Sequence, residues 1–414
     1  MILFFYMTLW HLDCSEKPEN TCLKFINLSH LDRLTEEIEV NGQSMAVVHI
    51  YSEYPAYGWH DASDEGIACV DDVSRAVIVY LHYYKLTGDT SLFSRIKMYC
   101  NFLIFMQNDD GEFYNFITAD HQINRSGRTS NKSFSQWAAR AYWALGYAFK
   151  IFKPIDIDYA GTLKKRFMLC KVPLRKNLRR YGEYQTINGK SYPLWLVNDY
   201  AADATSEFML GVAHVLATEQ DGELTRMAEQ LADGILKMQQ GSSETCAGAF
   251  LSWPGLWHGW GNSQSAALLQ LGNLLNKSQW ISAAEDEAGQ FYRPLIEGTM
   301  LHAVAIQIKR SEEFPQIVYD IRPMVTALVA LHQIKGKAEY ARLAGLAAAW
   351  LLGRNAAGTP MYDAGTGRGY DGIDHLQKVN RNAGAESTIE ALLTLLEIVI
   401  DPVACEAMMA GGHK

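Results

Sequence analysis

The stretch VDDVSRAVIVYLHYY (70–84) places apolar side chains at three- and four-residue intervals, which is the spacing of a helix. Ala76, Ile78 and Val79 fill the remaining faces, so the predicted helix is apolar nearly all round and is expected to be buried. Gly88 is expected to end it. The more polar segment 90–107 is predicted to form a second helix that packs outside the first.

The same pattern recurs along the chain: a polar start, a strongly apolar helix, a turn, a more amphipathic helix, and a loop rich in glycine and aromatic residues. Successive apolar helices start about 60 to 67 residues apart, which indicates a repeat architecture rather than several separate domains. Six such pairs predict an all-α fold, an (α/α)6 toroid of six helical hairpins. The apolar inner helices are expected to begin near Asp71, Lys132, Asp199, Gly261, Arg322 and Ala383.

The toroid is expected to be a single catalytic domain over residues 45–414, preceded by an N-terminal extension over 1–44. The segment SHLDRLTEEIE (29–39) is predicted to form a short helix in this extension. Little chain follows Ile400, so the last outer helix is either short or supplied by that N-terminal helix. Pro323 is expected at the N-terminal position of the fifth inner helix, where its missing N–H has no partner to lose.

The opening MILFFYMTLW is apolar but too short to span a bilayer, and it lacks the basic segment and cleavage site of a signal peptide. It is expected to pack on the domain or to be a start-site artefact, and no membrane span is predicted. The seven cysteines show no close pairing and no CxxC, so neither a disulfide framework nor a zinc ribbon is predicted. These features favour a reducing, cytoplasmic location.

The net charge of −9, with acidic and basic residues interspersed, provides no basic surface for nucleic acid, so a nucleic-acid partner is not expected. The glycine-rich stretches 253–265 and 362–375 lack the GxGxxG and P-loop contexts of nucleotide sites. No cofactor and no metal site is predicted, although calcium binding by YDGIDH (370–375) stays open as an alternative. The composition does not indicate an oligomeric state.

All inner helices of such a ring point the same way, so their polar starts gather at one mouth, where helix N-termini favour negative charge. Asp71 and Asp72 are therefore expected at the rim of a shared cavity. Neighbouring helical positions lie about 100° apart. We expect one of these two carboxylates to face the cavity and the other to bind Arg75.

Asp199, Asp203 and Glu207 are spaced to form one helical stripe of like charges, which is mildly destabilising unless something compensates. A cavity-facing proton donor with a raised pKa would compensate, and so would a structural network of arginines; both stay open. Asp203 is the member expected to act. Glu386, in the first turn of the last apolar helix, is the foremost candidate for general acid or base, the alternative being a glutamate stabilised by the helix dipole.

Aromatic and polar side chains near the predicted mouth suit carbohydrate binding, because sugar rings stack on aromatic faces and polar groups fix their orientation. For each of the aromatic residues, the alternative is burial under a loop. The candidate substrate-binding residues are Trp59, His60, Arg128, Asn131, Glu207, Trp257, His258, Trp260, Asn262, Tyr362 and Tyr370.

Three motifs, VDDVSRA (70–76), LTGDTSLF (86–93) and NAGAESTIEALL (382–393), together with the repeat plan, resemble the six-hairpin glycosidase superfamily over residues 45–400. VDDVSRA is similar to the inner-helix motif of unsaturated glucuronyl and rhamnogalacturonyl hydrolases, although those families lack this arginine pattern. NAGAES is similar to the last inner helix of family 9 glycosidases, which begins with a catalytic glutamate; the metal-site and histidine motifs of that family are not evident here. The resemblance implies a toroid enzyme and does not carry over one mechanism.

Hydrolysis of a glycosidic bond needs one protonated carboxyl and a second carboxylate that activates water or attacks. We therefore predict a glycoside hydrolase acting on an oligo- or polysaccharide. Its catalytic residues are predicted to be Glu386 and Asp72 as the first pair, Asp203 in reserve, and Asp71. A polysaccharide lyase or sugar epimerase on the same toroid, with a histidine or tyrosine base, stays open, and so does a glycan-binding protein without activity.

Overall fold

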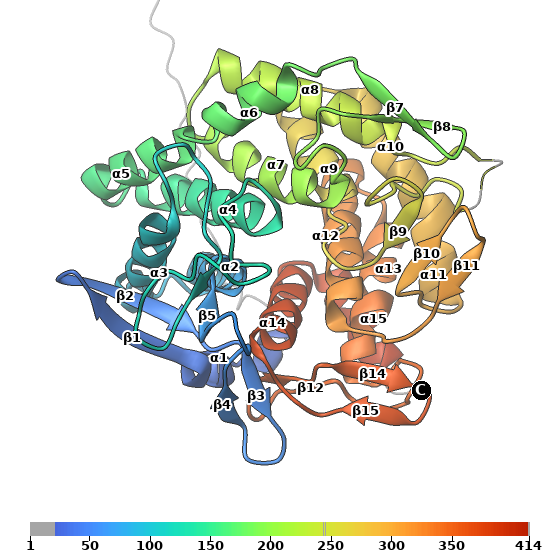
Figure 1. The fold of residues 1–414 in the computed structure, drawn as a ribbon. Helices are drawn as coiled ribbons and strands as arrows, with labels where there is room; N and C mark the ends of the chain where they lie inside the picture. Colours follow the sequence, from blue (N-terminus) through green and yellow to red (C-terminus); the bar gives the residue numbers. More distant parts are fainter. Residues whose placement is uncertain (1–20, 243, 245, 413–414) are drawn as a thin grey trace, which may run out of the picture.

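A ring of inner helices forms the centre of the molecule. The computed structural model describes residues 21–242, 244 and 246–412. The inner helices are α2 (Val70–Thr87), α4 (Gln136–Phe152), α7 (Ala202–Leu216), α9 (Gln264–Leu274), α12 (Val318–Lys335) and α14 (Ala385–Val399). Each contacts the next, and α14 contacts α2, so the ring closes (Figure 1). The predicted (α/α)6 toroid is therefore confirmed.

Each outer helix packs on the inner helix that precedes it in the chain. The outer helices are α3 (Phe93–Met106), α5 (Ile157–Met168), α8 (Gly222–Lys237), α10 (Ser278–Glu287), α13 (Ala338–Ala348) and α15 (Pro402–Gly411). Shorter segments extend this layer: η2 (Thr90–Leu92), α6 (Lys171–Leu178), η3 (Ala288–Tyr292), α11 (Arg293–Glu297) and η4 (Ala349–Leu352). The sixth outer helix is the short helix α15. Of the two predicted alternatives, a short last outer helix is therefore found, and the N-terminal helix does not serve as the sixth outer helix.

The first inner helix shows how the sequence pattern leads to burial. Every residue of 70–81 except Asp71 is buried in α2. The helix ends at Gly88, whose φ of 72° is a left-handed conformation that glycine adopts without strain. Glycine also permits a close helix contact, because a Cβ on Gly211 of α7 would lie 2.5 Å from the carbonyl oxygen of Tyr142 in α4. Apolar periodicity and small residues together therefore build the inner ring.

The helices α7 and α9 begin later than predicted, because the backbone before them is not helical. Asp199 and Gly261 each have a φ of 66°, in the left-handed region. Asp199 therefore lies outside α7, and its carboxylate pairs with Arg180 at 2.8 Å. The predicted stripe of three acids is wrong for Asp199, and only Asp203 and Glu207 share the helix.

The helix α12 begins earlier than predicted, at Val318. The Asp320 carboxylate accepts a hydrogen bond of 3.2 Å from the backbone N–H of Ile317, which stabilises this earlier start. Pro323 consequently lies inside the helix. Its expected N-terminal position is wrong because the cap adds a turn before it.

The segment before the ring contains a helix and a hairpin. Its elements are η1 (Leu23–Phe25), α1 (Ser29–Leu34), β1 (Thr35–Val40) and β2 (Gln43–Val48). The helix predicted over 29–39 is therefore wrong beyond residue 34. Ile38 and Val40 are buried and the glutamates that precede them are exposed, so burial of one face of the strand outweighs helical propensity here. The strand β2 packs on α3, and the domain boundary expected at residue 44 falls within β2.

The other strands form short antiparallel pairs in the loops between helices. They are β3 (Tyr51–Glu53), β4 (Gly58–His60), β5 (Ala68–Cys69), β6 (Phe116–Ile117), β7 (Tyr184–Ile187), β8 (Lys190–Pro193), β9 (Leu256–His258), β10 (Ala303–Ala305), β11 (Arg310–Glu312), β12 (Tyr362–Asp363), β13 (Arg368–Gly369), β14 (Gly372–His375) and β15 (Lys378–Asn380). The strands β9, β10 and β11 make one three-stranded sheet, and the rest pair in twos. These pairs shape the loops around the ring and leave its helical core unchanged.

A disulfide joins Cys22, ahead of α1, to Cys405 in α15. The expectation of no disulfide is wrong, because cysteines 383 positions apart in the sequence meet in the fold, and no spacing motif reveals such a pair. Cys14 lies outside the described residues. The described free thiols are Cys69, Cys100, Cys170 and Cys246.

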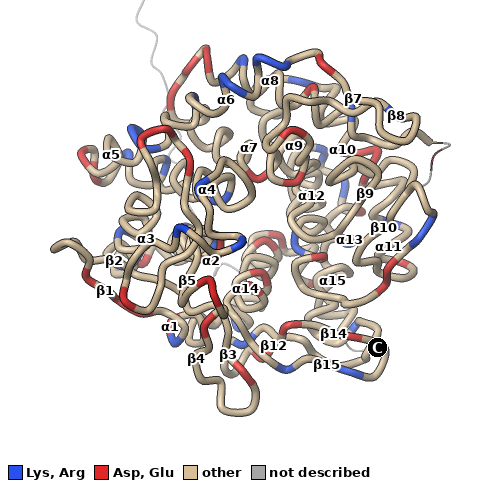
Figure 2. The backbone as a smooth tube through the Cα atoms, viewed as in Figure 1, with Lys and Arg blue, Asp and Glu red and all other residues tan. Residues whose placement is uncertain are grey.

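Acidic and basic positions are interspersed around the outside of the ring (Figure 2). This agrees with the mixed charge pattern of the sequence. Within the described part of the chain, no helix is long and apolar enough to cross a bilayer. The opening segment MILFFYMTLW lies outside the described residues.

Candidate active site

A pocket of about 720 Å³ opens at the end of the ring where the inner helices begin. The first turns of α2, α4, α7, α12 and α14 all contribute to its wall, so the polar helix starts gather at one mouth as predicted. Its lining consists of Ile50, Tyr51, Cys69, Asp71, Asp72, Arg75, Asn115, Phe116, Thr129, Gln136, Trp137, Arg140, Asp203, Trp253, Leu256, His258, Trp260, Tyr319 and Glu386.

A second hollow, of about 560 Å³, lies between α11, η4 and α15 in the outer layer. Its ionisable lining residues are Glu313 and Arg354. The Arg354 guanidinium already donates to the backbone carbonyls of Leu346 at 2.9 Å and Ile296 at 3.0 Å. The pocket at the mouth, with its larger set of acidic groups, is therefore the candidate active site.

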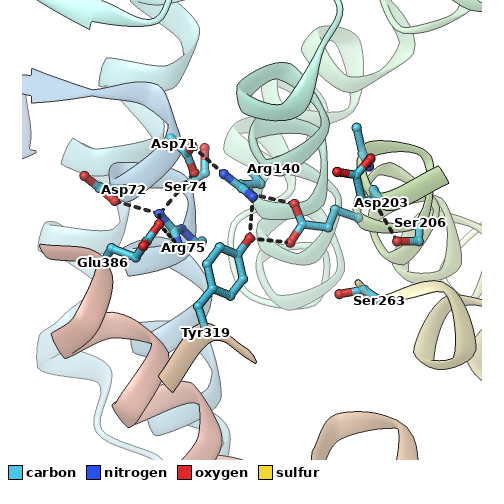
Figure 3. A network of polar contacts seen from close by, with 12 residues as sticks. Asp71, Asp72, Ser74, Arg75, Arg140, Asp203, Ser206, Ser263, Tyr319 and Glu386 are labelled. Carbon is cyan, nitrogen blue, oxygen red and sulfur yellow. Dashed lines mark hydrogen bonds and ion pairs between the residues drawn. The ribbon is translucent and has the colours of Figure 1, made fainter. Parts of the chain in front are cut away.

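Arg75 is the centre of a carboxylate cluster on one side of the pocket (Figure 3). Its buried guanidinium lies 2.8 Å from Asp72, 3.2 Å from Asp71, 3.3 Å from Glu386 and 2.9 Å from Glu390. Both aspartates thus contact Arg75, and both line the pocket. The expectation that only one of them binds Arg75 is wrong, because one guanidinium presents enough N–H donors to reach both.

Arg140 extends this network across the ring. Its Nε lies 2.6 Å from Glu207, and its two Nη atoms contact Asp71 and the hydroxyl of Tyr319 (Figure 3). The Tyr319 hydroxyl donates to Glu207 at 3.0 Å. Glu207 is fully buried behind the pocket wall, which fits the structural arginine network considered for the acidic stripe and not direct contact with a substrate.

Arg322 joins the remaining inner helices to the same network. Its guanidinium lies 2.7 Å from Glu390 and 3.2 Å from Glu207, and it donates to the Ser263 hydroxyl, just before α9, at 3.3 Å. Each inner helix or the residue before it therefore contributes a group to one buried polar network. This arrangement holds the helix starts in register around the pocket.

The carboxyl groups at the mouth have different proton affinities. Burial in the pocket wall raises the pKa of Glu386 to about 7; Arg75 opposes the rise, and the charges of Asp72 and Asp71 add to it. For Asp71, burial favours the neutral form, but the guanidiniums of Arg140 and Arg75 outweigh it and lower the pKa. Glu386 is therefore substantially protonated near neutral pH, whereas Asp71 is ionised.

The accessible surface of Glu386 lets that proton reach a ligand. Half of the side chain is exposed, although the surrounding walls desolvate its carboxyl. Asp72 is held more deeply: burial raises its pKa, which Arg75 opposes, and its side chain is 6% exposed. The two groups therefore differ in access to the pocket as well as in surroundings.

A histidine and a tryptophan form the opposite part of the wall. His258 Nε2 lies 3.3 Å from Asp203, and its ring stacks on Trp260 at 3.9 Å. The other face of Trp260 stacks on His302 at 4.3 Å, and His302 lies 2.9 Å from Asp320. This stack fixes the orientation of Trp260, whose partly exposed ring lines the pocket together with Trp137 and Trp253.

Several predicted site residues do not lie in this pocket. The ring of Trp59 stacks on His49 at 3.9 Å, and its Nε1 donates to the carbonyl of Arg33. His60 is exposed and lies 3.8 Å from Glu53 in the paired strand. Both residues belong to strand β4 of the β3–β4 hairpin, and neither side chain lines the pocket.

Trp257 and Asn262 are part of the core beneath the mouth. The Trp257 ring is 1% exposed and packs against Phe291 at 4.8 Å. The Asn262 amide donates to the backbone carbonyls of Phe250 at 3.2 Å and His258 at 3.1 Å. These two residues support the loop that carries His258 and Trp260.

The remaining four predicted residues are not part of the pocket lining. Arg128 and Asn131 are exposed in the loop before α4. Tyr362 is buried in β12, and the guanidinium of Arg381 lies 5.9 Å from the centre of the Tyr370 ring. Of the residues predicted to bind substrate, the pocket thus brings together His258 and Trp260, with Glu207 behind them.

The carboxylates of YDGIDH (370–375) are occupied by protein partners. Asp371 accepts hydrogen bonds from the backbone N–H of Gly384 at 3.1 Å and the Ser387 hydroxyl at 2.7 Å, and Asp374 lies 2.7 Å from Lys378. Across the described residues, no group of three or more histidine, cysteine, aspartate or glutamate side chains is arranged to hold a metal ion. Asp371 instead fixes the start of α14, which carries Glu386.

Sequence reasoning did not single out Arg140, Tyr319 or Glu390 as parts of the site. Arg140 and Glu390 were detectable as isolated charges within strongly apolar inner helices, since an unpaired buried charge is very unfavourable. Tyr319 carries no comparable signal. Tyr51 and Asn115 reach the pocket from loops, and no local pattern distinguishes them.

No family model and no curated protein matches this chain. Among solved structures, cellobiose 2-epimerase from Bacillus thermoamylovorans B4167 is similar with a TM-score of 0.64 and 12% identity, covering 92% of this chain and 97% of that one. A D-mannose isomerase gives 0.62 and 11%, covering 92% and 95%. The family 9 endoglucanase J30 gives 0.56 and 14%, covering 92% and 84%. These neighbours have the six-hairpin glycosidase fold, so the predicted resemblance is confirmed for the fold of nearly the whole chain.

Proposed function

We propose that this protein hydrolyses a glycosidic bond in an oligo- or polysaccharide, with Glu386 as general acid and Asp71 as the second carboxylate. The supporting observation is that both groups line one pocket, contact Arg75 and have pKa values shifted in opposite directions. Hydrolysis of an acetal uses one carboxyl that holds a proton and one that is ionised. The similarity of the fold to a family 9 endoglucanase agrees with this activity.

Asp71 is preferred to Asp72 as the partner of Glu386, which revises the pair favoured by the sequence. The Asp71 side chain is 22% exposed and that of Asp72 is 6% exposed. Asp72 also accepts a hydrogen bond of 3.2 Å from the Cys69 thiol. We assign Asp72 the role of holding Arg75 in place, and Asp203 that of orienting His258.

In the proposed reaction, Glu386 gives its proton to the glycosidic oxygen as the bond to the anomeric carbon breaks. Asp71 takes a proton from the attacking water or attacks the anomeric carbon itself. The guanidiniums of Arg75 and Arg140 keep Asp71 ionised for either role. The partly exposed indole rings in the lining offer flat surfaces on which sugar rings stack.

A sugar epimerase or isomerase is the second candidate function, because the pocket wall contains a histidine. His258 lines the pocket and pairs with Asp203, an arrangement that suits a base removing a proton next to a carbonyl. A cellobiose 2-epimerase and a D-mannose isomerase share the fold. This reaction would carry hydrogen from the solvent into the sugar without breaking a glycosidic bond.

The deciding experiment is product analysis on a panel of oligosaccharides in deuterated water. The proteins compared are the wild type, Glu386→Gln, Asp71→Asn and Asp158→Asn, the last of which removes an exposed carboxylate from α5. We expect the wild type and Asp158→Asn to release reducing sugar. Release should fall by about a hundredfold or more in the other two variants, with circular dichroism unchanged.

Undiminished release by Glu386→Gln would contradict the proposed acid. Deuterium in an uncleaved sugar, absent with His258→Asn, would support the epimerase instead. A product that absorbs ultraviolet light would indicate a lyase. Binding of the panel without any chemical change would support a glycan-binding protein.

A further inference from the structure

Carboxyl groups outnumber guanidiniums in the lining of the candidate pocket. Its lining contains the carboxyl groups of Asp71, Asp72, Asp203 and Glu386, together with the guanidiniums of Arg75 and Arg140. The network directly behind the wall adds two more carboxylates, Glu207 and Glu390, and one more guanidinium, that of Arg322. The site therefore holds more acidic groups than basic ones.

Both guanidiniums of the lining already have carboxylate partners. Arg75 contacts four carboxylates, and its side chain is 1% exposed. Arg140 contacts Asp71 and Glu207, and its remaining Nη donates to the Tyr319 hydroxyl. A ligand carboxylate would have to compete with these carboxylates for either arginine. Displacing Asp72, Glu207 or Glu390 would take an ion-pair partner from a buried carboxylate, which is strongly unfavourable.

The same groups are well matched to hydroxyl-bearing ligands. Carboxylate oxygens accept hydrogen bonds from sugar hydroxyls, and the protonated Glu386 carboxyl can also donate. The aromatic side chains Tyr51, Trp137 and Trp253 supply apolar faces for uncharged rings. Favourable contacts are therefore available to a neutral sugar, while an anionic one meets repulsion from the lining.

We propose that the pocket selects uncharged sugars and excludes uronic acids and other anionic sugars. The inference rests on the proposed function to the extent that it takes carbohydrate as the ligand, and it applies to hydrolysis and epimerisation alike. It distinguishes this protein from the unsaturated glucuronyl hydrolases that its VDDVSRA motif resembles.

Arg128 is the residue that would undermine this proposal. It is adjacent in the chain to Thr129, which lines the pocket, and its side chain is exposed. An exposed guanidinium beside the pocket lining would attract a ligand carboxylate without disturbing the buried network. The experiment therefore distinguishes a ligand carboxylate bound by Arg128 from one bound by the lining residues.

Binding is measured by nuclear magnetic resonance titration at pH 7 with Glu386→Gln, which keeps sugars uncleaved. The probes are matched pairs that differ only at carbon 6: methyl glucoside, galactoside and mannoside of both anomers against the corresponding methyl uronides, and cellobiose against cellobiouronic acid. We expect the neutral member of every binding pair to bind at least about tenfold more tightly than the uronide.

The pocket charge is then changed in the same background. Adding Asp203→Asn, which removes one lining charge, should reduce the preference for the neutral member by about threefold or more, whereas adding Asp158→Asn should leave it unchanged. A preference unaffected by Asp203→Asn would overturn the electrostatic explanation.

Equal or tighter binding of a uronide would overturn the proposed selectivity while leaving the carbohydrate function intact. Loss of that uronide binding in Arg128→Gln would then assign the contact to the rim. Absence of binding by every probe, neutral or anionic, would instead contradict the proposed carbohydrate function and the selectivity with it.

Discussion

At the end of the ring where α2, α4 and α14 begin, Arg75 and Arg140 lie among carboxylates in a network of ion pairs. At the other end, the same helices carry His82, Tyr147 and Glu397. There the ring of Tyr147 lies 5.1 Å from that of His82 and 4.2 Å from that of His214 on α7. Titratable groups thus occur at both ends, in different surroundings.

The surroundings determine which groups are charged. At the far end, desolvation lowers the pKa of His82 to about 3, lowers that of His214 well below its ordinary value, and raises that of Glu397 to about 7. Each of these shifts favours the neutral form. At the mouth, two guanidiniums overcome the same desolvation and keep Asp71 ionised. A nearby opposite charge, and not burial alone, therefore decides the state of a carboxyl in this ring.

Glu386 is an exception at the mouth. It shares Arg75 with three other carboxylates, and it lies at the edge of that cluster. The attraction of one guanidinium is then insufficient to offset desolvation and the neighbouring negative charges. The candidate acid therefore favours its protonated form although it belongs to the ion-pair network.

Arg75→Met is expected to produce the largest effect, because it removes the cation on which the mouth depends. Asp72 would stay buried without its ion-pair partner, and Glu390 would keep only Arg322, so we expect the free energy of unfolding to fall by about 3–5 kcal/mol. Urea denaturation measures this change. Arg293→Met, which removes a partly exposed guanidinium paired with Glu297 and Glu339, is the control and should change the free energy of unfolding by less than about 1 kcal/mol. Equal stability of the Arg75 variant and the wild type would refute the conclusion that Arg75 compensates the buried carboxylates at the mouth.

Cys405→Ser tests whether the disulfide stabilises the far end of the ring, as the ion pairs stabilise the mouth. Cys405 lies in the first turn of α15, just after α14 ends, and its disulfide to Cys22 closes a loop of 383 residues. Without that constraint we expect the free energy of unfolding to fall by about 2–4 kcal/mol. Thermal and urea denaturation should show the loss, and catalytic activity at 25 °C should be retained. Unchanged stability, with the wild-type bond verified by mass spectrometry, would count against this role.

The pH dependence of activity tests whether Glu386, at the mouth, acts as the general acid. Since Glu386 must carry a proton to act as acid and its pKa is about 7, we expect kcat/KM to fall about tenfold per pH unit above that value. Rates measured from pH 5 to 9, with circular dichroism at each pH to verify folding, test this expectation. A flat profile between pH 7 and 9 would show that Glu386 is not the acid.

Glu397→Gln tests the neutral state at the far end and should have the smallest effect. The folded-state pKa of about 7 exceeds the ordinary value of 4.5, so the stability associated with its proton is present below pH 4.5 and is lost as pH rises through 7. Glutamine is neutral at every pH. The two pKa values set an upper bound of about 3 kcal/mol on this effect, and the partial exposure of Glu397 screens it. We therefore expect the variant to gain about 1 kcal/mol in free energy of unfolding at pH 8 and nothing at pH 4, as measured by denaturation at both pH values. An equal gain at both would refute the assigned pKa shift.

The candidate site could be predicted from the sequence only in part. Glu386, Asp71, Asp72 and Asp203 were identifiable because acids at the starts of apolar helices are conspicuous, and all four line the pocket. The loop residues were less predictable. Trp257 is buried and Trp260 lines the pocket, although the two are three positions apart in the same loop.

The sequence by itself determined the helical hairpins, their repeat and the end of the ring at which acidic side chains gather. These properties follow from spacing within one helix and from the common direction of the inner helices. The tertiary structure decided which acid keeps a proton, which cysteines pair and which aromatic rings reach the pocket. Arg75 and Glu390 are 315 positions apart, yet they lie 2.9 Å from each other. Proton affinity depends on such neighbours in space, and local sequence does not contain them.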